Sequence, residues 1–159
     1  MRSLLTNLFL VGTLGLSGCA DSSNCDPRIS AQKNLQIFAD INNDLRKDVI
    51  YVAATKVRPS YNQVYESELR LKLADEHNNY GESSVIERFK YLPLDVKIED
   101  VDGDGNLDIL YVKPTRVRPS YNQVYESALI LRRGNGDGTF QPEVVIENFD
   151  GVPVGLSNR

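Results

Sequence analysis

The chain repeats itself at an offset of sixty residues, and each copy opens with a row of alternating acidic side chains. The first row runs from Asp40 to Asp48 (DINNDLRKD) and the second from Asp100 to Asp108 (DVDGDGNLD). Four apolar or aromatic residues follow each row directly, as VIYV at 49–52 and ILYV at 109–112. An acidic loop that leads into a strand, twice at one spacing, indicates a repeat protein with metal sites. The pattern does not predict an enzyme with a single pocket.

The repeat extends well beyond the two acidic rows. The segment Val57–Ser67 recurs unchanged as Val117–Ser127, and Val85–Phe89 recurs with one change sixty residues later. We therefore divide the chain into a first unit at residues 34–91, a second unit at residues 92–151, and the start of a third unit at residues 152–159.

The sequence predicts four strands in each unit. These are short runs rich in Val, Ile, Leu and Tyr, bounded by Gly, Pro and Asn turns. No segment of either unit holds a helical apolar stripe over three turns, so we expect an all-β domain. Four antiparallel strands at a regular period are typical of a β-propeller blade, which predicts two blades of an incomplete propeller. The expected strands are 35–39, 48–53, 66–73 and 84–89 in the first unit, and 96–99, 108–113, 126–132 and 144–148 in the second.

The second unit resembles a known repeat family. The pattern Asp-x-Asp-x-Asp-Gly-x-x-Asp before Ile-Leu-Tyr-Val, with the turn Gly134–Phe140 (GNGDGTF) after the third strand, is similar to the FG-GAP/VCBS repeat. That family includes the propeller of integrin α subunits and many bacterial surface proteins. The resemblance covers about residues 35–156. The first unit departs from it, because Asn42 replaces an Asp, Leu45 replaces a Gly, and residues 74–80 replace the Gly-rich turn.

Both acidic loops are candidate calcium sites. Calcium takes six to eight oxygen ligands, and carboxylates at alternate positions of a tight loop point inward together. We expect a structural rather than catalytic role for the ion. The alternative is a solvated acidic turn without metal, because Asp, Asn and Gly are ordinary turn residues. The predicted ligands are the side chains of Asp100, Asp102, Asp104 and Asp108 with the Asn106 carbonyl, and the side chains of Asp40, Asn42, Asp44 and Asp48 with the Arg46 carbonyl.

The N-terminus predicts export to the cell envelope. An apolar run at residues 4–16 follows a basic residue and is too short to span a bilayer as a stable helix. The tetrapeptide Leu16–Cys19 resembles the lipobox of bacterial lipoproteins. That resemblance implies a signal peptide at residues 1–18, a lipid on Cys19 that anchors the protein, and a flexible tether up to residue 33. In a Gram-negative cell, Ala20 after the cysteine implies the outer membrane. The alternative is an ordinary signal peptide with an incidental cysteine.

A duplicated segment offers a candidate binding surface. Residues 58–65 and their copy at 118–125 connect the second and third strands of each unit, and both are rich in Arg and Tyr, which are enriched at binding hot spots. A protein or a glycan could be recognised there. The alternative is a long hairpin whose tyrosines pack on their own blade. The candidate residues are Arg58, Tyr61, Asn62, Tyr65, Arg118, Tyr121, Asn122 and Tyr125.

Taken together, these features predict a lipid-anchored, calcium-stabilised binding module without enzyme activity. The net charge of −4 argues against a nucleic-acid partner. A propeller lyase or hydrolase is disfavoured, because the chain has a single histidine and no evident nucleophile–base pair. Propellers close with four to eight blades. Two units therefore leave three alternatives: copies assemble into a homo-oligomeric ring, the two blades pack as a sandwich, or the chain is a fragment of a larger propeller without independent activity.

Overall fold

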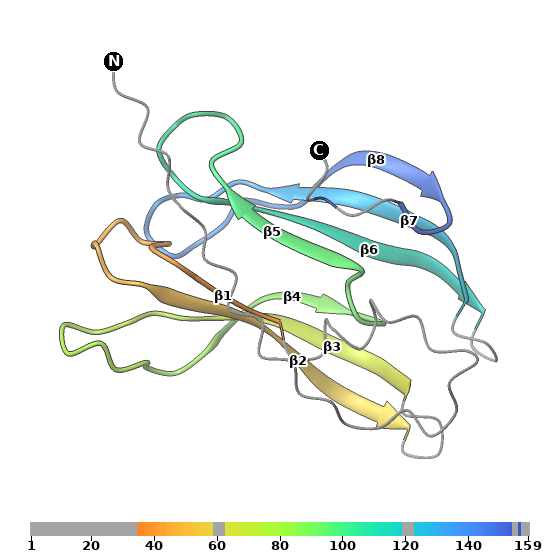
Figure 1. The fold of residues 1–159 in the computed structure, drawn as a ribbon, viewed down its shortest axis with the longest axis horizontal. Coiled ribbons are helices and arrows are strands. Elements are labelled where there is room, and N and C mark those ends of the chain that lie inside the picture. Colours follow the sequence, from red (N-terminus) through yellow and green to blue (C-terminus); the bar gives the residue numbers. More distant parts are fainter. Residues whose placement is uncertain (1–34, 59–62, 119–122, 154–155, 157–159) are drawn as a thin grey trace.

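The structure is a computed structural model that describes residues 35–58, 63–118, 123–153 and 156. Within these ranges the chain forms two four-stranded antiparallel sheets and no α-helix (Figure 1). The expected all-β class and four strands per unit are confirmed. None of the described residues belongs to a helix of the length and apolarity needed to cross a membrane. In chain order, the first sheet holds β1 (Gln36–Ala39), β2 (Asp48–Arg58), β3 (Gln63–Lys72) and β4 (Ser84–Phe89), and the second holds β5 (Asp95–Glu99), β6 (Asp108–Arg118), β7 (Gln123–Arg132) and β8 (Val144–Asp150).

The two central strands of each sheet are longer than the sequence predicted. We expected β2 to end at residue 53 and β3 to begin at residue 66, but the pairing continues through Val57 opposite Val64 to Arg58 opposite Gln63. The second sheet repeats this with Val117 opposite Val124. Cross-strand pairs of β-branched residues stabilise the extended ladder. The described residues of the duplicated Arg/Tyr segment, 58 and 63–65 with their copies 118 and 123–125, are therefore all in strands.

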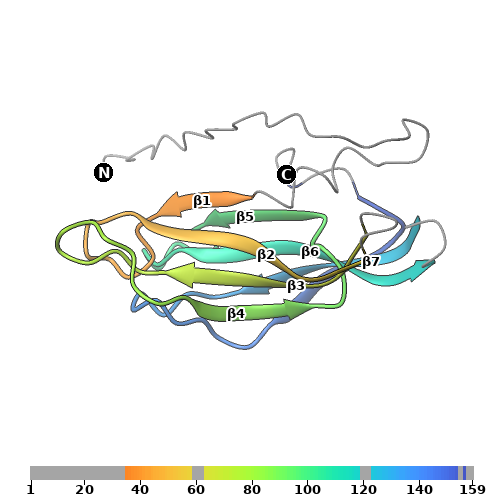
Figure 2. The same ribbon diagram turned by 90° about the horizontal axis from the view of Figure 1, so that it is seen from below.

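The two sheets pack face to face around one core, but they use non-equivalent faces (Figures 1 and 2). Side chains alternate along a strand, so a shift of one residue moves a side chain to the opposite face. The first sheet contributes Ile50, Val52, Leu69 and Leu71 to the core. The second sheet contributes Ile109, Tyr111, Ala128 and Ile130. These four match Val49, Tyr51, Glu68 and Arg70 of the first unit, which lie one residue out of step with its core side chains. The repeats therefore stack head to tail, with opposite faces of successive units in contact.

The two outward faces differ in polarity. On the first sheet, Arg70 Nη2 lies 2.6 Å from Glu68 Oε2, and Arg88 Nε lies 3.1 Å from the other oxygen of Glu68. On the second sheet, Val112 and Leu129 form a small apolar cluster with Leu156, which is only 5% exposed. The outward face of the first sheet therefore carries ion pairs, and the outward face of the second sheet carries an apolar cluster.

A polar contact joins the two sheets through Tyr111, whose side chain is fully buried. Its hydroxyl oxygen lies 2.9 Å from Glu143 Oε2 and 3.4 Å from Glu87 Oε2. Burial raises the pKa of Tyr111 far above its ordinary value, so the hydroxyl stays protonated and can donate a hydrogen bond. The guanidinium of Arg132 pairs with the Glu87 carboxylate, which belongs to the other unit. These bonds fix how one sheet lies on the other.

Candidate metal centre

The two acidic loops lie side by side at one end of the molecule. The first loop (residues 40–48) joins β1 to β2, and the second loop (residues 100–108) joins β5 to β6. The side-chain amide of Asn43 donates a hydrogen bond of 2.9 Å to Asn106 Oδ1, so the loops are in direct contact. The stacking of the sheets thus brings together two segments that are sixty residues apart in the chain.

The second loop is folded around the carboxylate of Asp100. Its Oδ1 accepts hydrogen bonds from the backbone N–H groups of Gly103 (2.7 Å) and Asp104 (3.2 Å), and its Oδ2 accepts one from Gly105 (3.0 Å). Gly103 and Gly105 have φ of 78° and 89°, in the left-handed region that glycine adopts without steric cost. These two glycines allow successive backbone amides to point at one carboxylate.

Asp108 ties the second loop to the turn between β7 and β8. The residue is fully buried, and its Oδ2 accepts a hydrogen bond from the N–H of Val101 at 2.9 Å. Its Oδ1 accepts another from the N–H of Gly134, also at 2.9 Å. A buried carboxylate is tolerated when its oxygens are hydrogen-bonded in this way. Sequence spacing suggested only a metal ligand here, and it missed this link to a turn 26 residues away.

Three carboxylates of the second loop converge. One oxygen from each of Asp100, Asp102 and Asp108 lies within 4.8 Å of the others. Calcium–oxygen bonds are about 2.3–2.6 Å long, so ligands on opposite sides of one ion lie roughly 5 Å apart. The three oxygens are therefore close enough together to share one cation. Asp102 Oδ2 also lies 2.9 Å from Arg133 Nε, which offsets part of the negative charge.

Asp104 is not one of the three converging carboxylates. Its Oδ1 accepts a hydrogen bond of 2.7 Å from the backbone N–H of Asn106, and its Oδ2 accepts one of 3.0 Å from the Asn106 side chain. These two hydrogen bonds hold the pKa of Asp104 below its ordinary value. The predicted roles of Asp104 and of the Asn106 carbonyl as calcium ligands stay predictions.

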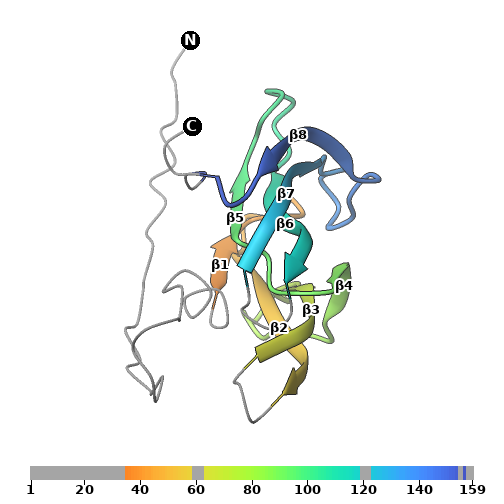
Figure 3. The ribbon, with the colours of Figure 1, turned by 90° about the vertical axis from the view of Figure 1, so that its right-hand side faces the viewer.

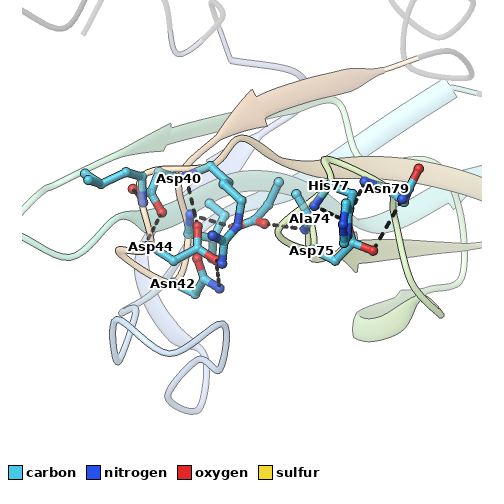
Figure 4. Close-up of polar contacts among 11 residues, drawn as sticks. Asp40, Asn42, Asp44, Ala74, Asp75, His77 and Asn79 are labelled. Carbon is cyan, nitrogen blue, oxygen red and sulfur yellow. Dashed lines mark hydrogen bonds and ion pairs between the residues drawn. The ribbon is translucent and has the colours of Figure 1, made fainter.

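The first loop has the same hydrogen-bonded frame. Asp40 accepts hydrogen bonds from the backbone N–H groups of Asp44 (3.0 Å) and Leu45 (2.8 Å). Asp48 is fully buried and accepts from the N–H groups of Ile41 (2.9 Å) and Ala74 (2.8 Å). Figure 4 shows the loop beside the turn that contains Ala74. Asp40 and Asp48 therefore hold the first loop through backbone hydrogen bonds, as Asp100 and Asp108 hold the second.

The interior of the first loop differs from that of the second. Arg46 Nη2 lies 2.6 Å from Asp44 Oδ2, and Asn42 donates a hydrogen bond of 2.9 Å to the same oxygen (Figure 4). Burial alone would raise the pKa of Asp44, but the hydrogen bonds from Arg46 and Asn42 and the charge of Arg46 lower it. Arg46 was predicted only as a carbonyl ligand. Its guanidinium instead places a positive charge inside the first loop.

This difference decides how well each loop fits a cation. In the part of the chain that the structure describes, only the second loop brings three carboxylates together. The first loop has an amide in place of one carboxylate, and a built-in cation beside Asp44. The buried Oδ1 of Asn42 has no hydrogen-bond partner within the described ranges and could coordinate a cation. The donor set of the second loop therefore suits calcium better than that of the first.

The turns between the third and fourth strands support both loops. In the first unit, Asp75 accepts hydrogen bonds from the backbone N–H groups of His77 and Asn79 within the turn (Figure 4), and the Tyr80 hydroxyl donates one of 3.2 Å to the Lys47 carbonyl of the loop. In the second unit, the backbone approaches so closely that a Cβ on Gly134 would lie 2.2 Å from the Leu107 carbonyl oxygen. Any larger residue at 134 would push this turn away from the second loop.

The other predicted sites are only partly covered by the structure. Cys19, Tyr61, Asn62, Tyr121 and Asn122 lie outside the described residues, as does the side chain of Arg58. Tyr125 packs on its own hairpin, because Arg116 lies 5.7 Å from its ring centroid and Arg118 Nη1 lies 3.4 Å from its hydroxyl. These contacts favour a hairpin that is stabilised by its own Arg and Tyr side chains.

Comparison with known proteins identifies no relative. No family model matches the chain, and searches of curated proteins and of solved structures give no match either. The resemblance to the FG-GAP/VCBS repeat therefore stays a prediction. Within the described residues, the fold and the geometry of the two loops define an all-β protein with one candidate cation site.

Proposed function

We propose that this chain is a non-enzymatic, calcium-stabilised binding module of the bacterial cell envelope, built from two FG-GAP/VCBS-like propeller blades. The observation that carries the proposal is the convergence of Asp100, Asp102 and Asp108 in the second loop. Three carboxylates at this spacing repel one another, and a divalent cation removes that repulsion. Oxygen-only ligands favour calcium over zinc or copper.

The role proposed for calcium is structural. Asp100 and Asp108 already hold the backbone of the second loop, so a bound ion would lock a frame that exists without it. Extracellular modules bind calcium with dissociation constants of about 10⁻⁴–10⁻³ M. At millimolar calcium such a site would add on the order of 1–2 kcal/mol to the free energy of unfolding. The Asn43–Asn106 hydrogen bond joins the two loops, so a calcium ion in the second loop would also restrict the motion of the first.

The head-to-tail stacking supports the blade interpretation. In a propeller each blade contacts the previous blade with one face and the next blade with the other, which requires that successive blades use non-equivalent faces. The core pairs such faces, with Leu69 and Leu71 of one unit opposite Ala128 and Ile130 of the other. Under this proposal, Cys19 would carry the lipid anchor at the outer membrane, and the module would contact a protein or a glycan.

A second candidate is that the chain is a fragment of a larger propeller. The observation that favours it is the apolar outward face of the second sheet at Val112 and Leu129. Their first-unit equivalents, Val52 and Leu69, are buried between the sheets. A further blade could therefore pack on the second sheet in the same way.

The calcium proposal is tested by titration calorimetry on the full chain carrying Cys19→Ser, which prevents lipidation. We expect one calcium ion per chain, and a melting temperature raised by about 2–8 °C relative to EDTA. Asp102→Asn should abolish both effects while the apo protein keeps its melting temperature, and magnesium serves as the control ion. Binding of two ions would add the first loop as a site. No binding at millimolar calcium would refute the proposal.

A further inference from the structure

Leu156 lies on the outward face of the second sheet, beyond the last strand. It forms an apolar cluster with Val112 of β6 and Leu129 of β7, and it is only 5% exposed. Three partly buried residues pack against this cluster, namely Leu94, Leu110 and Phe149. Leu156 is therefore the described residue after β8 that covers this apolar face.

The chain leaves the second sheet in the same way as it leaves the first. The Ser67 and Ser127 hydroxyls donate hydrogen bonds of 2.8 Å and 2.6 Å to a carbonyl group just after the fourth strand of their units, and both serines are buried. In the first unit the chain continues to Val96 of β5, which is buried in the core between the sheets. Leu156 lies sixty residues after Val96. It is therefore the equivalent apolar residue on the next face of the stack.

A hydrogen bond fastens Leu156 to the first strand of the second sheet. Its N–H group donates to Asp95 Oδ2 at 2.7 Å, and Asp95 begins β5. Figure 3 shows the chain turning towards β5 after it leaves β8. The first unit has Leu35 at the position of Asp95, and a leucine side chain offers no acceptor. The carboxylate that holds Leu156 is thus a feature of the second unit alone.

We propose that Leu156 is a cap that keeps the outward face of the second sheet from pairing with the same face of a second copy of this chain. Without the cap, Val112 and Leu129 would expose apolar surface, which drives association. The outward face of the first sheet is a poor partner, because burying its Glu68–Arg70 ion pair costs free energy. Two second sheets could instead meet across a two-fold axis, apolar face on apolar face. This inference goes beyond the proposed function and does not depend on calcium.

The test is the mass in solution of the full chain carrying Cys19→Ser, measured by sedimentation equilibrium in EDTA over a range of protein concentrations. We expect this parent chain to be monomeric. Leu156→Asp should raise the average mass up to about twofold as the concentration rises, because a charged side chain does not cover an apolar face. Leu156→Met keeps the apolar contact at similar volume and should stay monomeric.

A second variant removes the hydrogen bond and leaves the apolar contact. Asp95→Ala should also dimerise, but at higher protein concentration than Leu156→Asp, because only part of the attachment is lost. Val57→Asp is the matched control, since it also replaces an apolar side chain by an acid, at a strand position that is 46% exposed on the long hairpin. It should stay monomeric.

A third substitution separates a specific dimer from aggregation of partly unfolded chains. Leu110 is partly buried beside the cluster, so Leu110→Glu places a charge on the same outward face. Combined with Leu156→Asp, it should return the protein to a monomer, whereas aggregation of partly unfolded chains would increase. Melting curves by circular dichroism check that each variant is folded at the temperature of the measurement.

Three results would overturn the proposal: a parent chain that is already dimeric, a folded Leu156→Asp chain that stays monomeric, or an association that Leu110→Glu does not reverse. The first would mean that Leu156 does not prevent pairing, and the second that the exposed face does not pair. The third would mean that another surface associates.

Discussion

The two acidic loops have the same frame and different interiors. In both, the first Asp accepts backbone hydrogen bonds within the loop, and the last Asp is buried and ties the loop to the turn before the fourth strand. Inside, the second loop brings three carboxylates together, whereas the first places the Arg46 guanidinium on Asp44. Two Asp residues in each loop therefore serve folding, with or without a cation. The proposed calcium binding depends instead on the side chains inside the loop.

Replacing the buried Asp of either loop should destabilise the protein more than any other change proposed here. Asp48→Ala or Asp108→Ala would leave two backbone N–H groups without acceptors at a fully buried position. Each substitution should lower the free energy of unfolding by about 3–5 kcal/mol in EDTA, measured by urea denaturation. The exposed Asp102 makes the matched control, and Asp102→Asn should cost less than about 1 kcal/mol in EDTA. A small effect at either buried Asp would show that the frame is not shared.

An intermediate effect is expected from exchanging the loop interiors. Asn42→Asp with Arg46→Asn gives the first loop the acidic interior of the second, and Asp102→Asn with Asn106→Arg does the reverse. The first pair should create a calcium-dependent stabilisation of about 1–2 kcal/mol beyond that of the parent, and the second pair should remove the parental effect. Melting curves in calcium and in EDTA measure both. If Asn42→Asp with Arg46→Asn gains no calcium response, the interior alone does not determine the site.

The smallest effect concerns the backbone of the loops. Leu45 has a φ of 69° and is 94% exposed, while its equivalent Gly105 has a φ of 89°. A left-handed conformation costs a non-glycine residue about 1–2 kcal/mol, part of which is offset because glycine loses more backbone entropy on folding. Leu45→Gly should therefore stabilise the protein by about 0.5–1 kcal/mol, and Gly105→Leu should destabilise it by about 1–2 kcal/mol. Thermal denaturation in EDTA measures both, and a loss of stability on Leu45→Gly would contradict the comparison.

Local patterns predicted much of the fold, and long-range contacts account for what they missed. The apolar runs, the turns and the sixty-residue period predicted all eight strands, because these features depend on near neighbours in the chain. Alternate spacing also predicted that four carboxylates of the second loop converge, and all of them except Asp104 do. It could not show that Asp108 contacts Gly134, or that the Arg46 side chain folds back onto Asp44. Those contacts depend on how strands pair and on which rotamer a long side chain adopts.

Local patterns also did not predict which face of each sheet forms the core. Both faces of β6 carry apolar residues, with Ile109 and Tyr111 on one and Leu110 and Val112 on the other. Strand alternation alone therefore does not say which face meets the first unit. Only the first unit gives a hint, since Glu68 and Arg70 replace Ala128 and Ile130 on the face that points outward.

Because the units stack head to tail, a further unit would meet a different surface at each end of the molecule. If residues 92–151 were duplicated in frame, the new unit would bring side chains such as Ile109 and Tyr111 against the apolar face at Val112 and Leu129, and no new interface would have to evolve. A unit added before the first sheet would instead meet the Glu68–Arg70 ion pair and bury it. A lineage carrying this gene could therefore lengthen its product step by step at the C-terminal side, whereas the N-terminal side would need several substitutions first.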